Sequence, residues 1–166
     1  MIQRSYPIFM DFEASSLDLV ASYPVEVGIC MADGSAQGWL LRPHVLWLDW
    51  SEEAQSVHGI SRQRLMEEGH EIRSVAQALN QKFGTEKVYC DAWTFDSFWL
   101  HRLYKGARLK PTFELDSISA ILTPEQIDRW ADTRREVLED IELTAHRAEH
   151  DAMILRETWC RVVGPC

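Results

Sequence analysis

The architecture follows from a short apolar run near the N-terminus, Pro7-Ile8-Phe9-Met10-Asp11-Phe12-Glu13, which two acids interrupt. Such a run is typical of a buried β-strand. Residues two apart in a strand point to the same face, so the carboxylates of Asp11 and Glu13 project together. Two neighbouring buried acids repel each other and are costly to desolvate, and a bound cation removes both penalties. A strand end at which both acids reach solvent is the alternative, and for a lone D-x-E pattern it is the more common case.

Two further strands are expected directly after this run. Val25, Val27 and Ile29 alternate with other residues, as in a half-buried strand. Asp33-Gly34 is a strong hairpin signal and leads into Trp39-Leu40-Leu41. We therefore expect three sequential antiparallel strands.

The rest of the chain predicts helices that alternate with two more strands, which together with the first three indicate an α/β fold with a mixed sheet. The expected elements are a short helix capped by Ser61, a helix with Ile72, Val75, Leu79 and Phe83 on one stripe and Gly84 at its end, a strand at Val88-Tyr89-Cys90, a helix with Phe95, Trp99 and Leu103, a strand from Thr112 to Leu115, a helix capped by Thr123 in which Ile127, Trp130, Ala131, Arg134 and Val137 face mostly inward, and a last helix through Ala152, Leu155 and Trp159.

The composition indicates an ordinary globular protein with one domain over residues 1–166. Apolar residues make up 46% of the chain and charged residues 26%, which excludes disordered and fibrous classes. The first seven residues do not resemble a secretory signal, and no apolar run is long enough to span a bilayer. We therefore expect a soluble, cytoplasmic protein with no membrane association.

The net charge of −9 argues against broad electrostatic binding of nucleic acid, which needs a basic surface. An acidic enzyme can still act on phosphodiesters where cations occupy its carboxylates, because the ions supply local positive charge. The charge thus disfavours a sequestering binder more than a metallonuclease.

The absence of any C-x-x-C pair disfavours zinc clusters and redox dithiols and predicts free thiols at Cys30, Cys90, Cys160 and Cys166.

Two later segments carry the other candidate groups. Asp96 lies between aromatic residues after the fourth expected strand; a helix N-cap is its simpler role, and Asp91 competes weakly for the same site. His146 suits general-base chemistry, because the reference pKa of histidine is about 6.5. Asp151 shares a site with His146 if the histidine lies in the loop before the last helix and the acid in its first turns. His150 is the rival base, and two exposed polar histidines are the alternative.

The order of these groups resembles the DEDDh (DnaQ-like) 3′–5′ exonucleases, a family of the RNase H-like superfamily. The pattern is a D-x-E pair on the first strand, an acid after the fourth strand and an H-x4-D segment before the terminal helix. The resemblance extends from about Tyr6 to Trp159. The matching residues are Asp11, Glu13, Asp96, His146 and Asp151, supported by Tyr23-Pro24-Val25-Glu26-Val27-Gly28, Val57-His58-Gly59-Ile60-Ser61 and Asp116-Ser117.

The resemblance implies an RNase H-like mixed sheet of about five strands flanked by helices, and two Mg²⁺ or Mn²⁺ ions as cofactors. It implies that Asp11 bridges both ions, that Glu13 and Asp151 complete one of them, and that Asp96 holds the other through water. Hard oxygen ligands of this kind suit these ions better than zinc. His146 would activate the attacking water, and 5′-mononucleotides would leave the 3′ end of single-stranded DNA or RNA.

The resemblance also predicts substrate contacts and shows departures. Leu17 resembles the apolar position that packs on the terminal base, with strand-end packing as the alternative. Ala14 and His58 are expected at the same substrate site, although His58 fits a role in organising its loop better. The departures are Ala14 in place of a common threonine, Ser16 in place of a frequent glycine, and Cys90-Asp91 in place of a His-Asn pair. Trp47 and Trp50 are candidate surfaces for base stacking, with core packing as the more common role of a tryptophan.

Other readings stay open at this stage. A catalytically silent nucleic-acid-binding or protein-binding module on the same fold is one, and an endonuclease or phosphatase with the same carboxylates is another. The sequence does not distinguish RNA from DNA, the substrate length or the role of Asp91. A homodimer is left open, because several small members of the resembled family are dimers.

Overall fold

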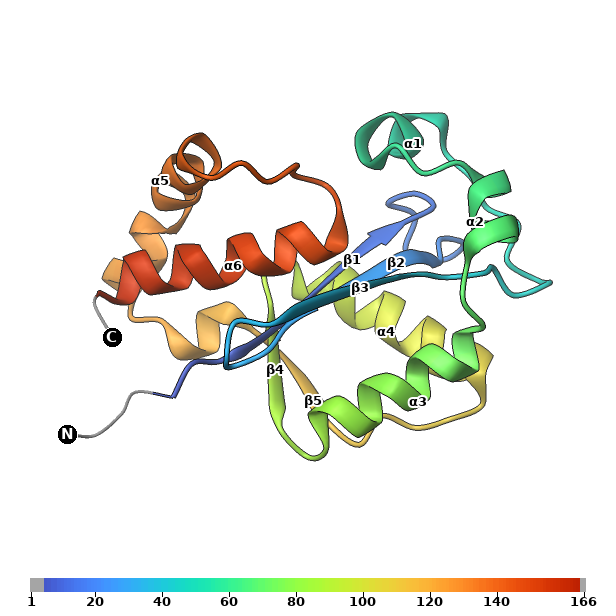
Figure 1. Ribbon diagram of the computed structural model, residues 1–166, viewed down its shortest axis with the longest axis horizontal. Coiled ribbons are helices and arrows are strands. Elements are labelled where there is room, and N and C mark those ends of the chain that lie inside the picture. The colour runs from blue at the N-terminus through green and yellow to red at the C-terminus, as the bar shows by residue number, and fades with distance from the viewer. Residues whose placement is uncertain (1–4, 165–166) are drawn as a thin grey trace.

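The acidic run forms β1 (Ile8–Ala14), the central strand of a five-stranded mixed sheet with the order β3-β2-β1-β4-β5 (Figure 1). The structure is a computed structural model and describes residues 5–164. β2 (Pro24–Cys30) and β3 (Ala36–Leu40) continue from β1 as an antiparallel meander, as expected. β4 (Lys87–Cys90) pairs with β1 in parallel, and β5 (Glu114–Ser117) pairs with β4 in parallel. This is the predicted mixed α/β sheet.

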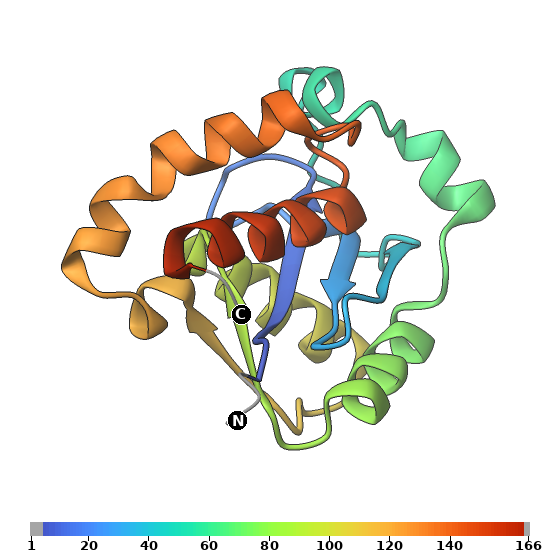
Figure 2. The same ribbon diagram turned by 60° about the vertical axis from the view of Figure 1, so that its left-hand side comes forward.

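Helices cover both faces of the sheet (Figures 1 and 2). α3 and α4 pack on one face and α6 on the other, where α5 lies mainly against α6. None of the helices in residues 5–164 combines the length and the apolar character that crossing a bilayer needs. The helices are α1 (Glu52–His58), α2 (Arg62–Glu68), α3 (Ile72–Phe83), α4 (Trp93–Ala107), the 3-10 helix η1 (Ile118–Ile121), α5 (Pro124–Asp140) and α6 (Ala148–Val163).

Alternation along β1 divides its side chains between the two faces. Met10 and Phe12 enter the core under α3 and α4. Phe9 enters the core under α6, and Asp11 and Glu13 follow it on that face. The acidic pair is therefore directed toward the helix that carries Asp151.

The predicted helix-end signals at Ser61, Gly84 and Thr123 are confirmed. Ser61 caps α2 by accepting a hydrogen bond from the Arg64 amide. Thr123 and Gln126 form a reciprocal capping box at the start of α5. Cys30 and Cys90 are buried free thiols, as expected; Cys160 is half-buried, and Cys166 lies outside the described residues.

Several local expectations are wrong. β2 is buried along its whole length instead of half-buried, because helices cover both sheet faces. The strand expected at Thr112 begins at Glu114, since the Thr112 hydroxyl and amide are hydrogen-bonded to the end of α3. In α5 Trp130 and Val137 are buried and Arg134 is half-buried, but Ile127 and Ala131 of the predicted inward stripe are exposed, because this helix packs mainly against α6. α1, a short polar helix, was not expected.

Trp47 is not an open stacking surface. It is buried, and its ring stacks on Tyr23 at a centroid distance of 5.5 Å. Trp50 is half-buried, and its indole N–H donates to the Gln55 side chain at 3.0 Å. Both indoles therefore serve mainly to anchor the segment that leads into α1.

Candidate active site

Four carboxylates from three parts of the chain meet where β1 ends. β1 and β4 are parallel, so their carboxyl ends lie at the same edge of the sheet, and α4 starts just after β4. Asp11 and Glu13 lie on β1, Asp96 in the first turn of α4 and Asp151 in the first turn of α6. Asp96 is the fourth residue of its helix, which Ala92 caps, so the alternative of an N-cap role is excluded.

The acids raise one another's pKa. Burial holds the pKa of Asp11 well above its usual range, and Asp96, Asp151 and Glu13 raise it further. The pKa of Glu13 rises to about 9, first through burial and then through the hydrogen bond and charge of Asp151. The pKa of Asp96 rises to about 8, mainly because of burial, although its hydrogen bond with the Cys90 thiol lowers it. Ionising all four groups is therefore unfavourable without added positive charge.

Two buried oxygens mark where that charge is missing. Asp11 Oδ2 and Asp96 Oδ2 are buried and have no hydrogen-bond partner among residues 5–164. Such atoms cost free energy unless a proton or a cation satisfies them. The donors are hard carboxylate oxygens, which fit Mg²⁺ or Mn²⁺. The residues at this edge of the sheet thus match the divalent cations that the sequence predicted.

The metal-free protein is expected to lose stability as pH rises from 5 to 9. The unfolded pKa values of Glu13 and Asp96 are about 4.5 and 3.8, and the folded values are about 9 and 8. In this window the unfolded chain is ionised while the folded chain retains protons, so unfolding releases protons and a higher pH favours it. We expect Tm in EDTA to fall across this window and to fall less with Mn²⁺, because cations replace the protons. A flat or rising Tm in EDTA would contradict the acid cluster.

His146 lies in the loop that enters α6, as the H-x4-D pattern requires. Its backbone φ of 64° is in the left-handed region, which only His146 and Arg108 adopt among the non-glycine residues in positions 5–164. The His146 amide donates to Asp151 Oδ1 at 3.1 Å and so fixes this loop. One potential ligand atom from each of Glu13, His146 and Asp151 lies within 4.8 Å of the others. The imidazole is exposed, so it is placed between the acids and solvent.

Glu26 and Arg147 anchor this loop, and the sequence did not identify their role. Glu26 is buried in β2 and accepts hydrogen bonds from Nε and Nη2 of Arg147. It also accepts the Ala148 amide at 2.8 Å, which replaces the missing side-chain cap of α6. The contact joins positions 121 and 122 residues apart, so no local pattern reveals it. Glu26 thereby sets the position of Asp151 and His146.

The loop after β1 is held by its own polar contacts. The hydroxyls of Ser15 and Ser16 both donate to Asp49 at 2.7 Å. His58 Nε2 lies 3.2 Å from the Ala14 carbonyl, and His58 Nδ1 accepts the Ile60 amide at 3.0 Å. Together these contacts define a neutral His58 with the proton on Nε2, and burial lowers its pKa. His58 therefore organises this loop.

A cavity of about 340 Å³ opens beside Glu13. It brings together the predicted substrate residues Ala14, Leu17 and His58, of which Leu17 is 71% exposed while the other two are buried. The hollow has the size of a small ligand site and adjoins the acids. Their contacts with a substrate stay a prediction.

Asp91 and His150, the alternative candidates for the acid and the general base, are placed less favourably than Asp96 and His146. Asp91 is exposed, and its charge raises the pKa of Asp11 and Asp96. His150 is half-buried, and its Nδ1 lies 3.0 Å from the Thr144 carbonyl. Of the two histidines, only His146 belongs to the group with Glu13 and Asp151.

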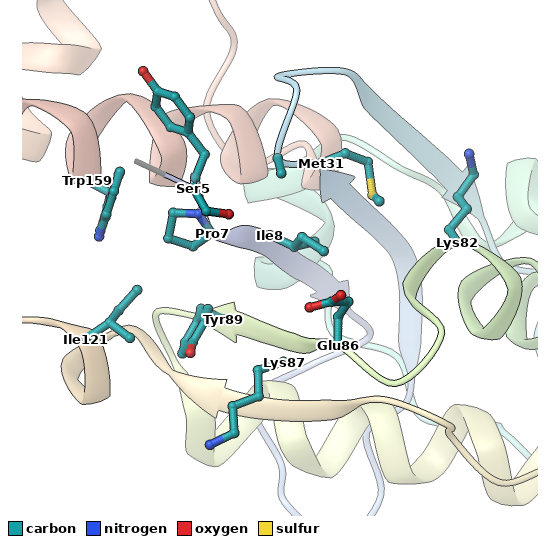
Figure 3. Close-up of a pocket in the computed structure, with 12 residues that line it drawn as sticks. Ser5, Pro7, Ile8, Met31, Lys82, Glu86, Lys87, Tyr89, Ile121 and Trp159 are labelled. Carbon is teal, nitrogen blue, oxygen red and sulfur yellow. The ribbon is translucent and has the colours of Figure 1, made fainter. Parts of the chain in front are cut away.

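A separate hollow of about 600 Å³ lies where β1 begins (Figure 3). Ile8 and Tyr89 line it together with Lys82, Glu86 and Lys87. Ile8 is five residues before Glu13, a distance of about 17 Å in a strand. This cavity is therefore not part of the acidic site.

The sheet order and the acidic edge beside β1 define an RNase H-like α/β fold. Solved structures of exonuclease I share it. One exonuclease I structure has a TM-score of 0.71 at 13% identity over 96% of this chain and 41% of that one. A complex of the E. coli enzyme with a dA16 oligonucleotide has a TM-score of 0.67 at 14% identity over 91% and 39%. Exonuclease I from Methylocaldum szegediense has a TM-score of 0.58 at 17% identity over 76% and 30%.

The likeness to these enzymes is one of fold. The chain spans about two fifths of the length of the first two of these exonuclease I chains. No protein-family model matches this sequence, and no curated protein sequence matches it either.

Proposed function

We propose that this protein is a metal-dependent 3′–5′ exonuclease of the DEDDh type, which releases 5′-mononucleotides from single-stranded DNA or RNA ends. The observation that carries the proposal is the convergence of Asp11, Glu13, Asp96 and Asp151 without a compensating basic side chain. Every group that acts strongly on Asp11 is itself a carboxylate. A purely structural cluster would pair such acids with Lys or Arg, as Glu26 is paired with Arg147.

The four acids would hold two divalent cations, with Glu13 and Asp151 toward one and Asp96 toward the other. When bound, such a pair supplies positive charge that stabilises the attacking and leaving oxygens of an in-line phosphodiester displacement. The protein contributes the rest. Asp11, between the other acids, holds its carboxylate rigidly on the central strand, and burial keeps bulk water from screening it.

His146 would accept the proton of the attacking water at an imidazole nitrogen. The imidazole is exposed and can pass that proton to solvent, while the hydrogen bond from its amide to Asp151 fixes its backbone. Leu17 would pack on the terminal base across the cavity beside Glu13. The E. coli exonuclease I structures include complexes with dA16 and dT13 oligonucleotides, which favours single strands as the substrate class.

The decisive assay uses matched DNA and RNA dodecanucleotides labelled at the 5′ end, with Mg²⁺ or Mn²⁺. We expect a ladder that shortens from the 3′ end and mononucleotide products. Internal fragments would indicate an endonuclease, and inorganic phosphate a phosphatase. If neither substrate yields products, a catalytically silent binding module is the correct description.

The choice of base is tested by two histidine variants. We expect His146→Ala to lower kcat by about 10²- to 10⁴-fold, the usual contribution of a general base. Divalent-ion binding, measured by calorimetry, should survive this change, because the carboxylates remain. His150→Ala is the control and should lie within about threefold of the parent. The reverse pattern would assign the base to His150.

A further inference from the structure

A groove of about 450 Å³ runs between α4 and the segment that leads into β5, the edge strand of the sheet. Trp93, Ser97, His101 and Lys105 line it from α4, and Lys110 lines it from the following loop. We call these five residues the α4 groove. α4 packs against β5 as well as against β1 and β2.

The α4 groove is basic in an acidic protein. Three of its lining side chains, His101, Lys105 and Lys110, are basic and exposed, and none of its lining residues is acidic. The chain as a whole carries a net charge of −9. The cavity beside Glu13 has acids on its wall. The cavity where β1 begins, here called the distal cavity, has Glu86 together with its two lysines. A surface of this charge is suited to a polyanion.

The groove also presents an exposed indole. Trp93 is 47% exposed, whereas every other Phe, Tyr and Trp side chain in residues 5–164 is buried or half-buried. Its indole N–H donates to the Leu115 carbonyl at 3.2 Å, so the ring is held in place. A fixed, exposed indole beside basic side chains is the combination that binds single-stranded nucleic acid by stacking and charge.

The groove is aligned with the acidic site. Trp93, Ser97, His101 and Lys105 follow one another at intervals of four, which places them on one side of α4. Trp93 precedes Asp96 by three residues, so the stripe begins one turn from a predicted metal ligand. From there to Lys105 the helix rises about 18 Å, enough for several nucleotides.

We propose that the α4 groove binds the nucleotides on the 5′ side of the reacting 3′ end, with a base stacked on Trp93 and phosphates beside His101, Lys105 and Lys110. This inference rests on the proposed exonuclease function and adds a path for the rest of the strand. It explains how a protein of net negative charge holds an anionic polymer: the acids serve the cations, and this strip serves the phosphates.

The test compares two substrates, a dinucleotide and a 5′-fluorescein-labelled dodecanucleotide. The variants are Lys105→Ala/Lys110→Ala and Trp93→Ala, with Trp93→Phe as the version that keeps a stacking ring. The matched control is Lys82→Ala/Lys87→Ala, which removes the same charge at the distal cavity (Figure 3). Melting curves verify that each variant folds.

We expect each groove variant to lower kcat/KM for the dodecanucleotide about tenfold and to leave the dinucleotide within twofold. Loss of two phosphate contacts should also reduce the salt dependence, log kcat/KM against log salt, by about 1.4. Trp93→Phe and the distal control should resemble the parent. Equal losses of kcat/KM on both substrates, or no loss on the dodecanucleotide, would overturn the proposed role of the groove in binding the strand.

Failure of the proposed function gives a different result. If the parent hydrolyses neither substrate, binding of the dodecanucleotide to Asp11→Asn protein with Mg²⁺ is followed by fluorescence anisotropy. Weaker binding in the groove variants alone would still support the groove, and unchanged binding would overturn it. Displacement of the oligonucleotide by an equally charged glutamate peptide would assign the groove to acidic protein partners instead.

Discussion

Asp11→Asn is expected to raise the melting temperature of the metal-free protein while it abolishes hydrolysis. Asp11 is half-buried on the central strand with its Oδ2 atom buried, and four other carboxylates raise its pKa. Asparagine keeps the shape of the side chain but removes a charge that nothing nearby neutralises. At pH 8 we expect Tm in EDTA to rise by roughly 4–8 °C, which corresponds to about 2 kcal/mol for a protein of this size.

The same substitution should lower turnover by about three orders of magnitude or more, because Asp11 would help to hold the cations, which would supply several kcal/mol of transition-state stabilisation. A rise in Tm together with a fall in turnover distinguishes a metal ligand from a structural acid. A structural acid would lose stability on substitution, as buried partners are left unpaired. Glu26→Gln is the control for that behaviour, since Glu26 is paired with Arg147, and its Tm should fall. A lower Tm for Asp11→Asn in EDTA would show that the protein itself neutralises this carboxylate.

The gain should depend on pH in a defined direction. Below the unfolded pKa of about 3.8 the Asp11 carboxyl is protonated in both the folded and the unfolded protein, so it does not affect stability. Above that pH the unfolded chain ionises while the raised pKa keeps the folded protein protonated, and the loss of stability grows as pH rises toward the folded pKa. Asp11→Asn should therefore be near neutral below about pH 4 and increasingly stabilising as the pH rises above that value. Saturating Mn²⁺ should reverse the order, because the parent binds the cation and the variant has lost a ligand.

Much of the site could be predicted because its residues are placed by local sequence patterns. The D-x-E spacing puts two carboxylates on one strand face, and the H-x4-D spacing places a loop histidine beside a first-turn acid. The first arrangement follows from strand periodicity alone, whereas the second also requires that the histidine lies in the loop before α6. The structure places Asp11, Glu13, His146 and Asp151 as these spacings require.

The parts that were missed depend on distant partners. Glu26 occupies a polar position in an alternating strand pattern. It is buried and caps the start of α6 only because α6 packs against β2. In the sequence Asp49 resembles an ordinary loop acid, and only the fold brings it to the hydroxyls of Ser15 and Ser16, which donate hydrogen bonds to it. α1 has too few apolar residues for a periodic signal. Tertiary contacts decide all three, so a single sequence does not predict them.

Gly28→Ala is expected to cause the largest structural loss of any single methyl group near the site. A Cβ at Gly28 would lie 2.1 Å from the Ala148 carbonyl carbon and 2.3 Å from the Glu149 amide nitrogen. Both neighbours are backbone atoms at the start of α6, so neither can rotate away. α6 must move off the sheet, and we expect about 3 kcal/mol of lost stability, at the upper end of the usual range for overpacking.

Moving α6 should also damage catalysis in the molecules that remain folded, because Asp151 and His146 move with it. A displacement of 1 Å at a catalytic group can cost about 10²-fold in rate, so kcat should fall by that order at temperatures well below Tm. Gly38→Ala is the matched control. Gly38 pairs with Gly28 across β2 and β3, but its Cβ would lie 3.1 Å from Glu149 Cβ and 3.7 Å from the Val27 carbonyl oxygen. Only a small local shift is needed to relieve these contacts, so the control should retain most stability and activity. Equal effects at the two glycines would mean that the approach of α6 to β2 does not position the site, and that the acids are held in place by β1 and α4 alone.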